Sequence, residues 1–281
     1  FGWTLGEDTK ILELTHSAIS RTANWNNFQN AVSKRGRDVL DNLRKGDDTY
    51  SSTFFFVTSL YRAWSSGDGF TALNTLRFQS PDSHKERTLF SSVDEMLHWS
   101  SVLDEFVTRC KSDNVEVSSI SSILNFVWDN EICSKSARIT QYEDRTDFDK
   151  ETHKERRDEF LNTLTLIPFR ELLSFYDYLN DTSPFCTEHS TKEFDNVILI
   201  IDNSTWKQQY KVSTLFGSSD HIDARIERTL KLFYVAISRA RNNLIVVYKN
   251  PTADSVAGAK ELFGEDNVQP LEEVLPDIAV S

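Results

Sequence analysis

Two arginines stand close together in the stretch KLFYVAISRARNNLIVVYKN, which runs from position 231 to 250. Arg239 and Arg241 come at the end of a segment with helical spacing, 227–240, and precede an apolar strand. A guanidinium group is planar, permanently charged and able to pair with a phosphate through two hydrogen bonds. Held at the edge of a sheet, it can meet the negative charge that phosphoryl transfer develops. The alternative is that both arginines cap the helix, because cations are favoured at a helix C-terminus. Arg241 could also be simply a surface cation.

The segments around these arginines follow an α/β pattern. FDNVILIIDN contains a continuous apolar run, Val197 to Ile201, which predicts a strand buried on both faces as in a parallel sheet. A second buried strand is expected at Leu244–Tyr248, and KILELT at 10–15 alternates as a short strand does. If parallel strands present their ligand at their carboxyl ends, the arginines should lie near that edge.

The middle of the chain is dominated by helical patterns. Helices are expected over 31–45 and 53–64, and SVDE at Ser92 is a capping box. Pro168 should open a further helix, FRELLSFYDYL, after a charged loop and a solvated helix at 134–158. The apolar positions that should form the core recur at helical spacing: Val93, Met96, Leu97, Leu103, Phe106, Val107, Ile120, Ile123, Leu124, Val127, and with them Trp64, Trp99 and Trp128.

The simplest organisation is one α/β domain built from both ends of the chain, 1–30 and 181–281, with an α-helical insertion at 31–180. The 281 residues are 39% hydrophobic, which is ample for a packed core. The three cysteines are far apart and lack CxxC spacing, so neither a disulfide framework nor a zinc ribbon is expected. No membrane span and no signal peptide are evident, and we expect a protein of the cytoplasm, or of the nucleus in a eukaryote.

The net charge of −12 argues against nucleic acid as a partner, but its distribution weakens that objection. Residues 251–281 contain seven acidic residues and Lys260, a net charge of −6. A groove needs only a few local cations. The helical insertion is locally basic, and its cations are Lys34, Arg35, Arg37, Arg44 and Lys45. These side chains either contact a DNA duplex or simply form a solvated face.

Two motifs together resemble the C-terminal half of superfamily 1 helicases of the UvrD/Rep/PcrA kind. LFYVAISRARNNL is similar to motif VI, L-x-Y-V-A-x-[ST]-R-A-[RK]-x-x-L. CTEHSTKEFDNV is similar to motif V, T-x-H-x-x-K-G-x-E-F-x-x-V, and precedes it in the expected order. A weaker resemblance, ILELTHSAISR, lies near the start of the chain. The resemblance implies the second RecA-like domain of an ATP-dependent helicase that moves 3′ to 5′ along single-stranded DNA.

The resemblance also assigns roles to residues. Arg239 becomes the arginine finger that reaches the γ-phosphate of ATP, with Mg²⁺ arriving with the nucleotide. Glu193 would contact the nucleotide sugar; the alternative is a solvated acid at a strand entrance. Thr187, His189 and Lys192 would lie near single-stranded DNA. The alternative for His189 is a hydrogen bond to the loop backbone, which could coexist with DNA contact.

The chain departs from the family in two respects. The family has Gly and one more residue between the motif V Lys and Glu, whereas Glu193 follows Lys192 directly. No G-x-x-x-x-G-K-[ST] is present, so nothing cradles the β-phosphate. We therefore expect no ATP hydrolysis by this chain alone. The N-terminal ATP-binding half should lie upstream or on another chain; the alternative is a degenerate, non-catalytic module that binds DNA or protein.

Overall fold

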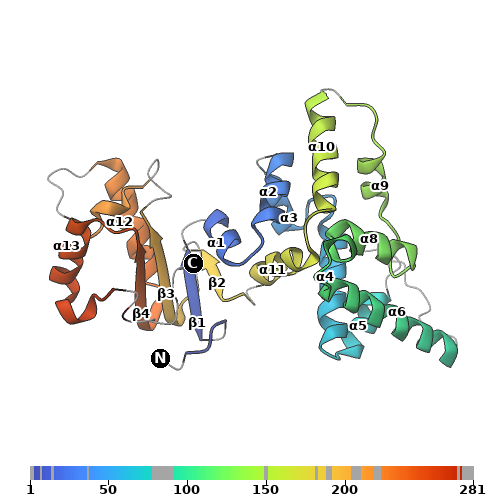
Figure 1. The fold of residues 1–281 in the computed structure, drawn as a ribbon, viewed down its shortest axis with the longest axis horizontal. Helices are drawn as coiled ribbons and strands as arrows, with labels where there is room; N and C mark the ends of the chain where they lie inside the picture. The colour runs from blue at the N-terminus through green and yellow to red at the C-terminus, as the bar shows by residue number, and fades with distance from the viewer. Residues whose placement is uncertain are drawn as a thin grey trace. The chain divides into compact units, whose positions relative to one another are not determined.

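The chain folds as two compact units, Phe1–Ile19 with Asp181–Ser281, and Ser20–Asn180 (Figure 1). The inner boundary thus falls at Ile19, where the sequence analysis placed it at residue 30. Of His16, Ser17 and Thr187 only the backbone is described. The computed structural model describes residues 3–6, 8–13, 16–36, 38–77, 92–148, 151–180, 183–187, 192–203, 210–217, 223–270 and 273.

The first unit contains a four-stranded sheet in which all described strands are parallel, in the order β2-β1-β3-β4. This confirms the predicted mixed α/β class, and it is consistent with a RecA-like domain. β3 lies in the middle of the described sheet, between β1 and β4. Val197, Leu199 and Ile201 on one face are buried, whereas Ile198 and Ile200 on the other face are partly exposed, so the prediction of a strand buried on both faces holds for one face only. The strands are β1 (Thr9–Glu13), β2 (Phe185–Thr187), β3 (Phe194–Asp202) and β4 (Ala240–Lys249).

Helix α12 (Ala224–Ile237) covers one face of this sheet. Asp223 caps it by accepting hydrogen bonds from the amides of Arg225 and Ile226, both at 2.8 Å. Ala236 and its apolar neighbours pack against Val197, Leu199 and Ile201, which are at most 1% exposed. Helix α13 (Ala253–Phe263) follows β4, and two single 3-10 turns, η1 (Val212–Thr214) and η2 (Glu265–Asn267), complete the described part of this unit.

The prediction that the strand after the arginines is buried was wrong. β4 lies at the edge of the described sheet, and Leu244 is 39% exposed. The strand also begins at Ala240 rather than 244, because α12 ends at Ile237. An edge strand has a neighbour on one side only, so apolar content alone does not bury it.

The secondary-structure elements described in the second unit are all helices. Its boundaries differ from the predicted ones chiefly at 31–45, where Gly36 separates two helices, as its poor helix propensity favours. The helices, starting with the one that spans the junction between the units, are α1 (His16–Thr22), α2 (Asn26–Arg35), α3 (Val39–Lys45), α4 (Ser51–Ser65), α5 (Gly69–Leu76), α6 (Val93–Lys111), α7 (Val115–Ser118), α8 (Ile120–Asp129), α9 (Ala137–Glu143), α10 (Glu151–Leu164) and α11 (Phe169–Leu179).

A side chain of another helix accepts hydrogen bonds from the start of α2. Trp25 at its N-cap makes no capping hydrogen bond with its side chain. Glu171 of α11, only 7% exposed, accepts instead from the Phe28 amide at 3.0 Å and from Asn27 Nδ2 at 2.7 Å. Trp25 itself is fully buried against Phe175. The predicted core tryptophans Trp64, Trp99 and Trp128 are each only half-buried, because they lie at the margins of their helices' buried faces.

Helix α6 follows the predicted pattern in its second half only. Ser92 caps it as expected, accepting from the Glu95 amide at 3.2 Å. Leu103 and Phe106 are buried, whereas Val93, Met96 and Leu97 are 67%, 48% and 60% exposed. Helical spacing therefore marked a continuous apolar side of α6, but the described neighbours cover only part of it.

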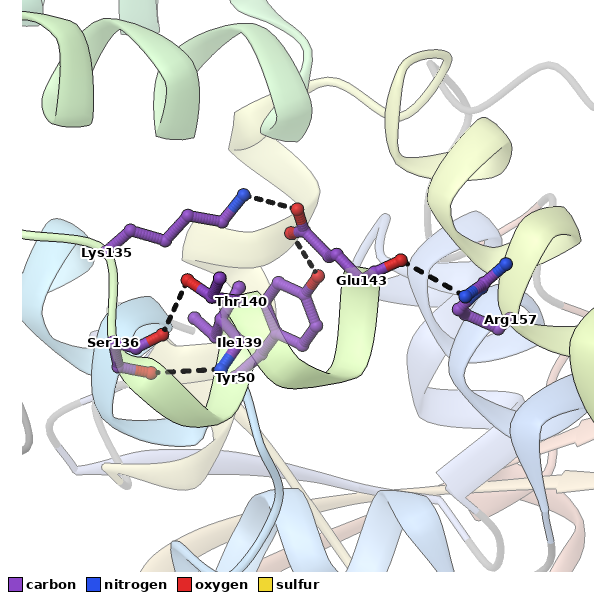
Figure 2. Close-up of polar contacts among 7 residues, drawn as sticks. All are labelled: Tyr50, Lys135, Ser136, Ile139, Thr140, Glu143 and Arg157. Carbon is purple, nitrogen blue, oxygen red and sulfur yellow. Dashed lines mark hydrogen bonds and ion pairs between the residues drawn. The ribbon is translucent and has the colours of Figure 1, made fainter. Parts of the chain in front are cut away.

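A polar cluster joins α9 to the helices around it (Figure 2). The carboxylate of Glu143 accepts from the Tyr50 hydroxyl at 2.7 Å and pairs closely with the Lys135 ammonium. Its backbone oxygen accepts from Arg157 at 3.1 Å. Glu143, in a segment predicted to be a charged loop, therefore ties together residues that are far apart in the sequence, through both its side chain and its backbone oxygen.

Candidate functional site

Arg239 lies in the short turn between α12 and β4. Its amide donates to the Ala236 oxygen at 3.3 Å, and its own oxygen accepts from the Phe194 amide at 2.8 Å. The backbone of Arg239 is thus fixed both to the end of the helix and to the start of β3. A side chain that leaves from this turn has a rigid base.

The Arg239 side chain is partly buried and incompletely satisfied. Its Nε is buried and has no hydrogen-bond partner among the described residues. A buried donor on a charged group that lacks an acceptor costs on the order of 1–3 kcal/mol or more. A ligand could supply the missing acceptor only after the side chain moves, because the atom is buried.

Arg241 lies in β4 and faces Glu193, which immediately precedes β3. Arg241 Nε donates to Glu193 Oε2 at 3.3 Å, and the two side chains are 58% and 55% exposed. Arg241 does not cap the helix, because the helix ends at Ile237 and Arg241 is already within the strand, where it is an exposed surface cation. The structure therefore brings two residues of the separate motifs into contact.

Both Glu193 and Arg239 lie at the amino ends of their strands. Phe194, the first residue of β3, pairs with Ala240, the first residue of β4. The expectation that the arginines mark the carboxyl edge of the sheet was wrong. A residue between a crossover helix and the next parallel strand necessarily lies where that strand begins, which is the opposite edge.

A row of polar side chains crosses the same edge, and the sequence analysis missed it. Asn243 Nδ2 donates to Asn196 Oδ1 at 2.7 Å, and Asn196 Nδ2 donates to Thr9 Oγ1 at 3.3 Å. Thr9 Oγ1 in turn donates to Asp8 Oδ1 at 2.7 Å, and this bond is the main cause of the lowered pKa of Asp8. The only sign of this row in the sequence was the pair of asparagines near the starts of β3 and β4. The row fastens three strands together beside Glu193.

The motif V residues do not all gather at this edge. Thr187 ends β2 opposite Glu13, which pairs in turn with Ile200. Thr187 is therefore level with the later part of β3, roughly 20 Å along the strand direction from the Glu193 end. Lys192 is exposed and adjacent to Glu193, and His189 lies outside the described residues.

The basic residues of the helical unit are largely engaged with acids. Arg35 forms an ion pair with Asp48 at 3.0 Å in which the side chains are only 8% and 7% exposed. Lys34 pairs with Glu159 at 2.6 Å and Arg44 with Asp41 at 3.6 Å. Arg37 lies outside the described residues. Arg35, at least, is a core residue and is not available to nucleic acid.

Over part of its length the chain is similar to the Gabija protein GajB of Bacillus cereus (strain HuB5-5). The two are 36% identical over 88 residues, which cover 28% of this chain and 13% of that protein. The chain thus matches a small part of a longer relative. No protein-family model matches the chain. No solved structure matches it either.

Two further findings concern the kinds of site that the described residues contain. None of the described helices is long and apolar enough to cross a membrane. In the same part of the chain, no group of three or more His, Cys, Asp and Glu side chains is arranged as it would be around a metal ion.

Proposed function

We propose that this chain is the second RecA-like domain, with its helical insertion, of an ATP-dependent 3′ to 5′ DNA helicase or translocase. The observation that carries the proposal is Arg239: its position matches the motif VI arginine, its backbone is fixed at a strand entrance, and its buried Nε has no partner among the described residues. The partial similarity to the Gabija protein supports a helicase-related function. The all-parallel sheet is the fold that such a domain requires.

In this proposal Arg239 acts as the arginine finger. ATP with Mg²⁺ binds mainly to an N-terminal RecA-like half, in the same polypeptide or on another chain. Closure of the two halves would bring the guanidinium to the γ-phosphate, where it stabilises the charge of the transition state. Glu193 at the same edge would contact the nucleotide sugar. Thr187, His189 and Lys192 would contact the backbone of single-stranded DNA, which gives sequence-independent binding.

The test is ATPase activity of the longest natural version of the polypeptide, with and without single-stranded DNA. Arg239→Ala should lower kcat by about 10³-fold or more, the range seen for arginine fingers. Arg239→Lys should recover little, because an ammonium lacks the planar fork. Arg228→Ala, an exposed arginine of α12, is the matched control and should retain activity. Equal turnover in the Arg239 and Arg228 variants would refute the arginine finger.

A second candidate is a non-catalytic module that binds DNA or protein. It is favoured by the shortened motif V and by the ion pair that occupies the Glu193 carboxylate. No turnover in a natural version that does contain a phosphate-binding G-x-x-x-x-G-K-[ST] loop would favour this candidate over the motor. DNA-stimulated turnover would exclude it.

A further inference from the structure

The helical unit contains a surface that the proposed function does not use. It is formed by α6 and α8, which pack against each other. Three apolar side chains on the first turns of α6, Val93, Met96 and Leu97, are 67%, 48% and 60% exposed. They recur at i, i+3 and i+4, so they share one side of the helix. We call these three residues the apolar patch.

The same side of α6 continues from the apolar patch towards an acidic hollow. Leu97, Ser101 and Glu105 are spaced four residues apart, so they follow one another along the helix. Glu105, Asp129 and one cation, Arg109, line a polar hollow of about 460 Å³ between α6 and α8, which we call the acidic hollow.

Arg109 holds the side chain of Glu105 in place within the hollow. Glu105 Oε1 accepts from Arg109 Nε at 2.9 Å and from its NH2 at 2.7 Å. The Arg109 guanidinium also lies 4.6 Å from the centre of the Phe126 ring. These contacts hold the Glu105 carboxylate in place and leave its Oε2, together with the exposed Asp129, able to receive a donor from outside.

The charge of this region indicates what kind of partner it fits. Residues 93–131 contain eight acidic and two basic residues, a net charge of −6, against −12 for the whole chain. The phosphates of DNA or RNA would be repelled here, and so would a second copy of the same surface. A cationic partner would be attracted, and interfaces in general match charges of opposite sign.

We propose that the apolar patch and the acidic hollow together form a docking surface for a lysine- or arginine-rich amphipathic helix of a partner protein. Apolar side chains of the partner cover Val93, Met96 and Leu97, as in helix-in-groove recognition. A basic side chain further along the partner helix enters the hollow and pairs with Glu105 and Asp129. The proposal is independent of the proposed function, because none of these residues belongs to the nucleotide or DNA sites.

The probe is a fluorescein-labelled helical peptide of leucine and lysine at amphipathic spacing, titrated with the full chain while fluorescence anisotropy is measured. A leucine–glutamate peptide, in which the charge is reversed, tests the contribution of charge. A lysine–serine peptide, which lacks the apolar side, tests the contribution of apolar contact. We expect the leucine–lysine peptide to bind and the other two to bind at least about tenfold more weakly, since both interactions contribute.

The variants locate the binding. Met96→Ser with Leu97→Ser, and separately Glu105→Gln with Asp129→Asn, should each weaken binding of the leucine–lysine peptide about tenfold. The controls are Leu262→Ser, which removes a 67% exposed leucine from α13, and Glu261→Gln with Asp266→Asn, which removes two exposed acids from the other unit. Circular dichroism and thermal unfolding check that every variant folds.

Three outcomes would overturn the proposal. If the control variants lose as much affinity as the test variants, the peptide is attracted only by the overall charge. If the lysine–serine peptide binds equally well, the apolar patch takes no part. If a single-stranded DNA oligonucleotide binds the chain and loses that binding in the Met96 and Leu97 variant, the surface belongs to nucleic acid.

Discussion

Glu193 and Arg241 join the entrances of two neighbouring parallel strands by an ion pair of 3.3 Å between Oε2 and Nε. One residue comes from the motif V segment and the other from the motif VI segment, 48 positions apart in the sequence. Because both side chains are more than half exposed, the pair contributes little to stability. Its effect should be on where the Glu193 carboxylate points.

The first prediction separates positioning from stability at this pair. Arg241→Ala should change the free energy of unfolding by less than about 0.5 kcal/mol, as expected for an exposed pair. In the longest natural version, it should raise the KM for ATP severalfold and leave kcat nearly unchanged, because it disorders a ground-state contact. Thermal unfolding and steady-state kinetics measure the two effects.

Lys231→Ala is the control for this prediction. Lys231 forms a pair with Glu227 on α12, at 2.6 Å, in which both side chains are also more than half exposed. Removing this pair should leave the KM for ATP unaltered. An unchanged KM in Arg241→Ala would mean that the pair does not orient Glu193.

The second prediction concerns the contact of α13 with the η1 segment. A Cβ on Gly258 would lie 1.4 Å from the Phe216 oxygen, so the two backbones could not keep their positions. Ser255, fully buried one turn earlier, donates to the Ser213 oxygen at 2.8 Å and fixes the same approach. Gly258→Ala should therefore destabilise the α/β unit by about 3 kcal/mol, measured by urea unfolding.

Gly69→Ala tests whether this effect comes from the contact rather than from the loss of a glycine. A Cβ on Gly69, the first residue of α5, meets nothing within 4 Å. That substitution should be neutral or stabilise by up to about 1 kcal/mol, through the unfolded chain. Equal losses at the two glycines would contradict the steric explanation.

Much of the fold followed from local patterns. The apolar run of β3, the Ser92 cap of α6 and the proline before α11 each determine their own element, and the structure contains all three. The exposure of β4 could not be predicted, because a strand's sequence does not say whether it has one neighbour or two. The same is true of the first turns of α6, whose burial depends on which helices reach them.

The candidate site was predicted in its residue types and only partly in its geometry. No glycine or proline stands between Ile237 and Arg241, so no residue type indicated that the helix stops before Arg239 and that Arg241 belongs to the strand. The row from Asp8 to Asn243 depends on register between segments as far as 187 positions apart, which local patterns do not contain. The predicted contacts of Thr187, His189 and Lys192 with DNA remain predictions.

The third prediction concerns the buried ion pair of the helical unit. Arg35 pairs with Asp48 at 3.0 Å and lies over the rings of Phe160 and Tyr142, at 4.5 and 5.0 Å from their centres. Arg35→Met should cost about 3–5 kcal/mol, because it leaves the Asp48 carboxylate buried without its partner. Adding Asp48→Asn should recover part of that loss, measured by urea unfolding.

The matched control is the neighbouring Lys34, whose pair with Glu159 is about half exposed at both ends. Lys34→Met should cost less than about 1 kcal/mol. If the two single variants were equally stable, the Arg35 pair would behave as a surface pair in spite of its burial.

The last prediction is a loss of stability at alkaline pH that depends on Tyr50. Burial, together with the nearby Glu143 carboxylate that accepts its hydroxyl proton, raises the pKa of Tyr50 far above its ordinary value of 10.0. The unfolded chain therefore loses this proton near pH 10, while the folded chain keeps it. Since the unfolded state then binds fewer protons, stability is full below about pH 10 and falls as the pH rises above it.

Tyr50→Phe isolates this effect. The variant should be less stable at pH 7 by about 1–3 kcal/mol, because the Glu143 carboxylate loses a donor, and its stability should fall less steeply between about pH 9 and 11. Tyr234→Phe, which alters a 69% exposed ring, should have the same free energy of unfolding as the unmodified chain at every pH. Urea unfolding across this pH range gives the slopes. Identical slopes for Tyr50→Phe and the unmodified chain would show that Tyr50 titrates alike in the folded and unfolded states, and would contradict the raised pKa.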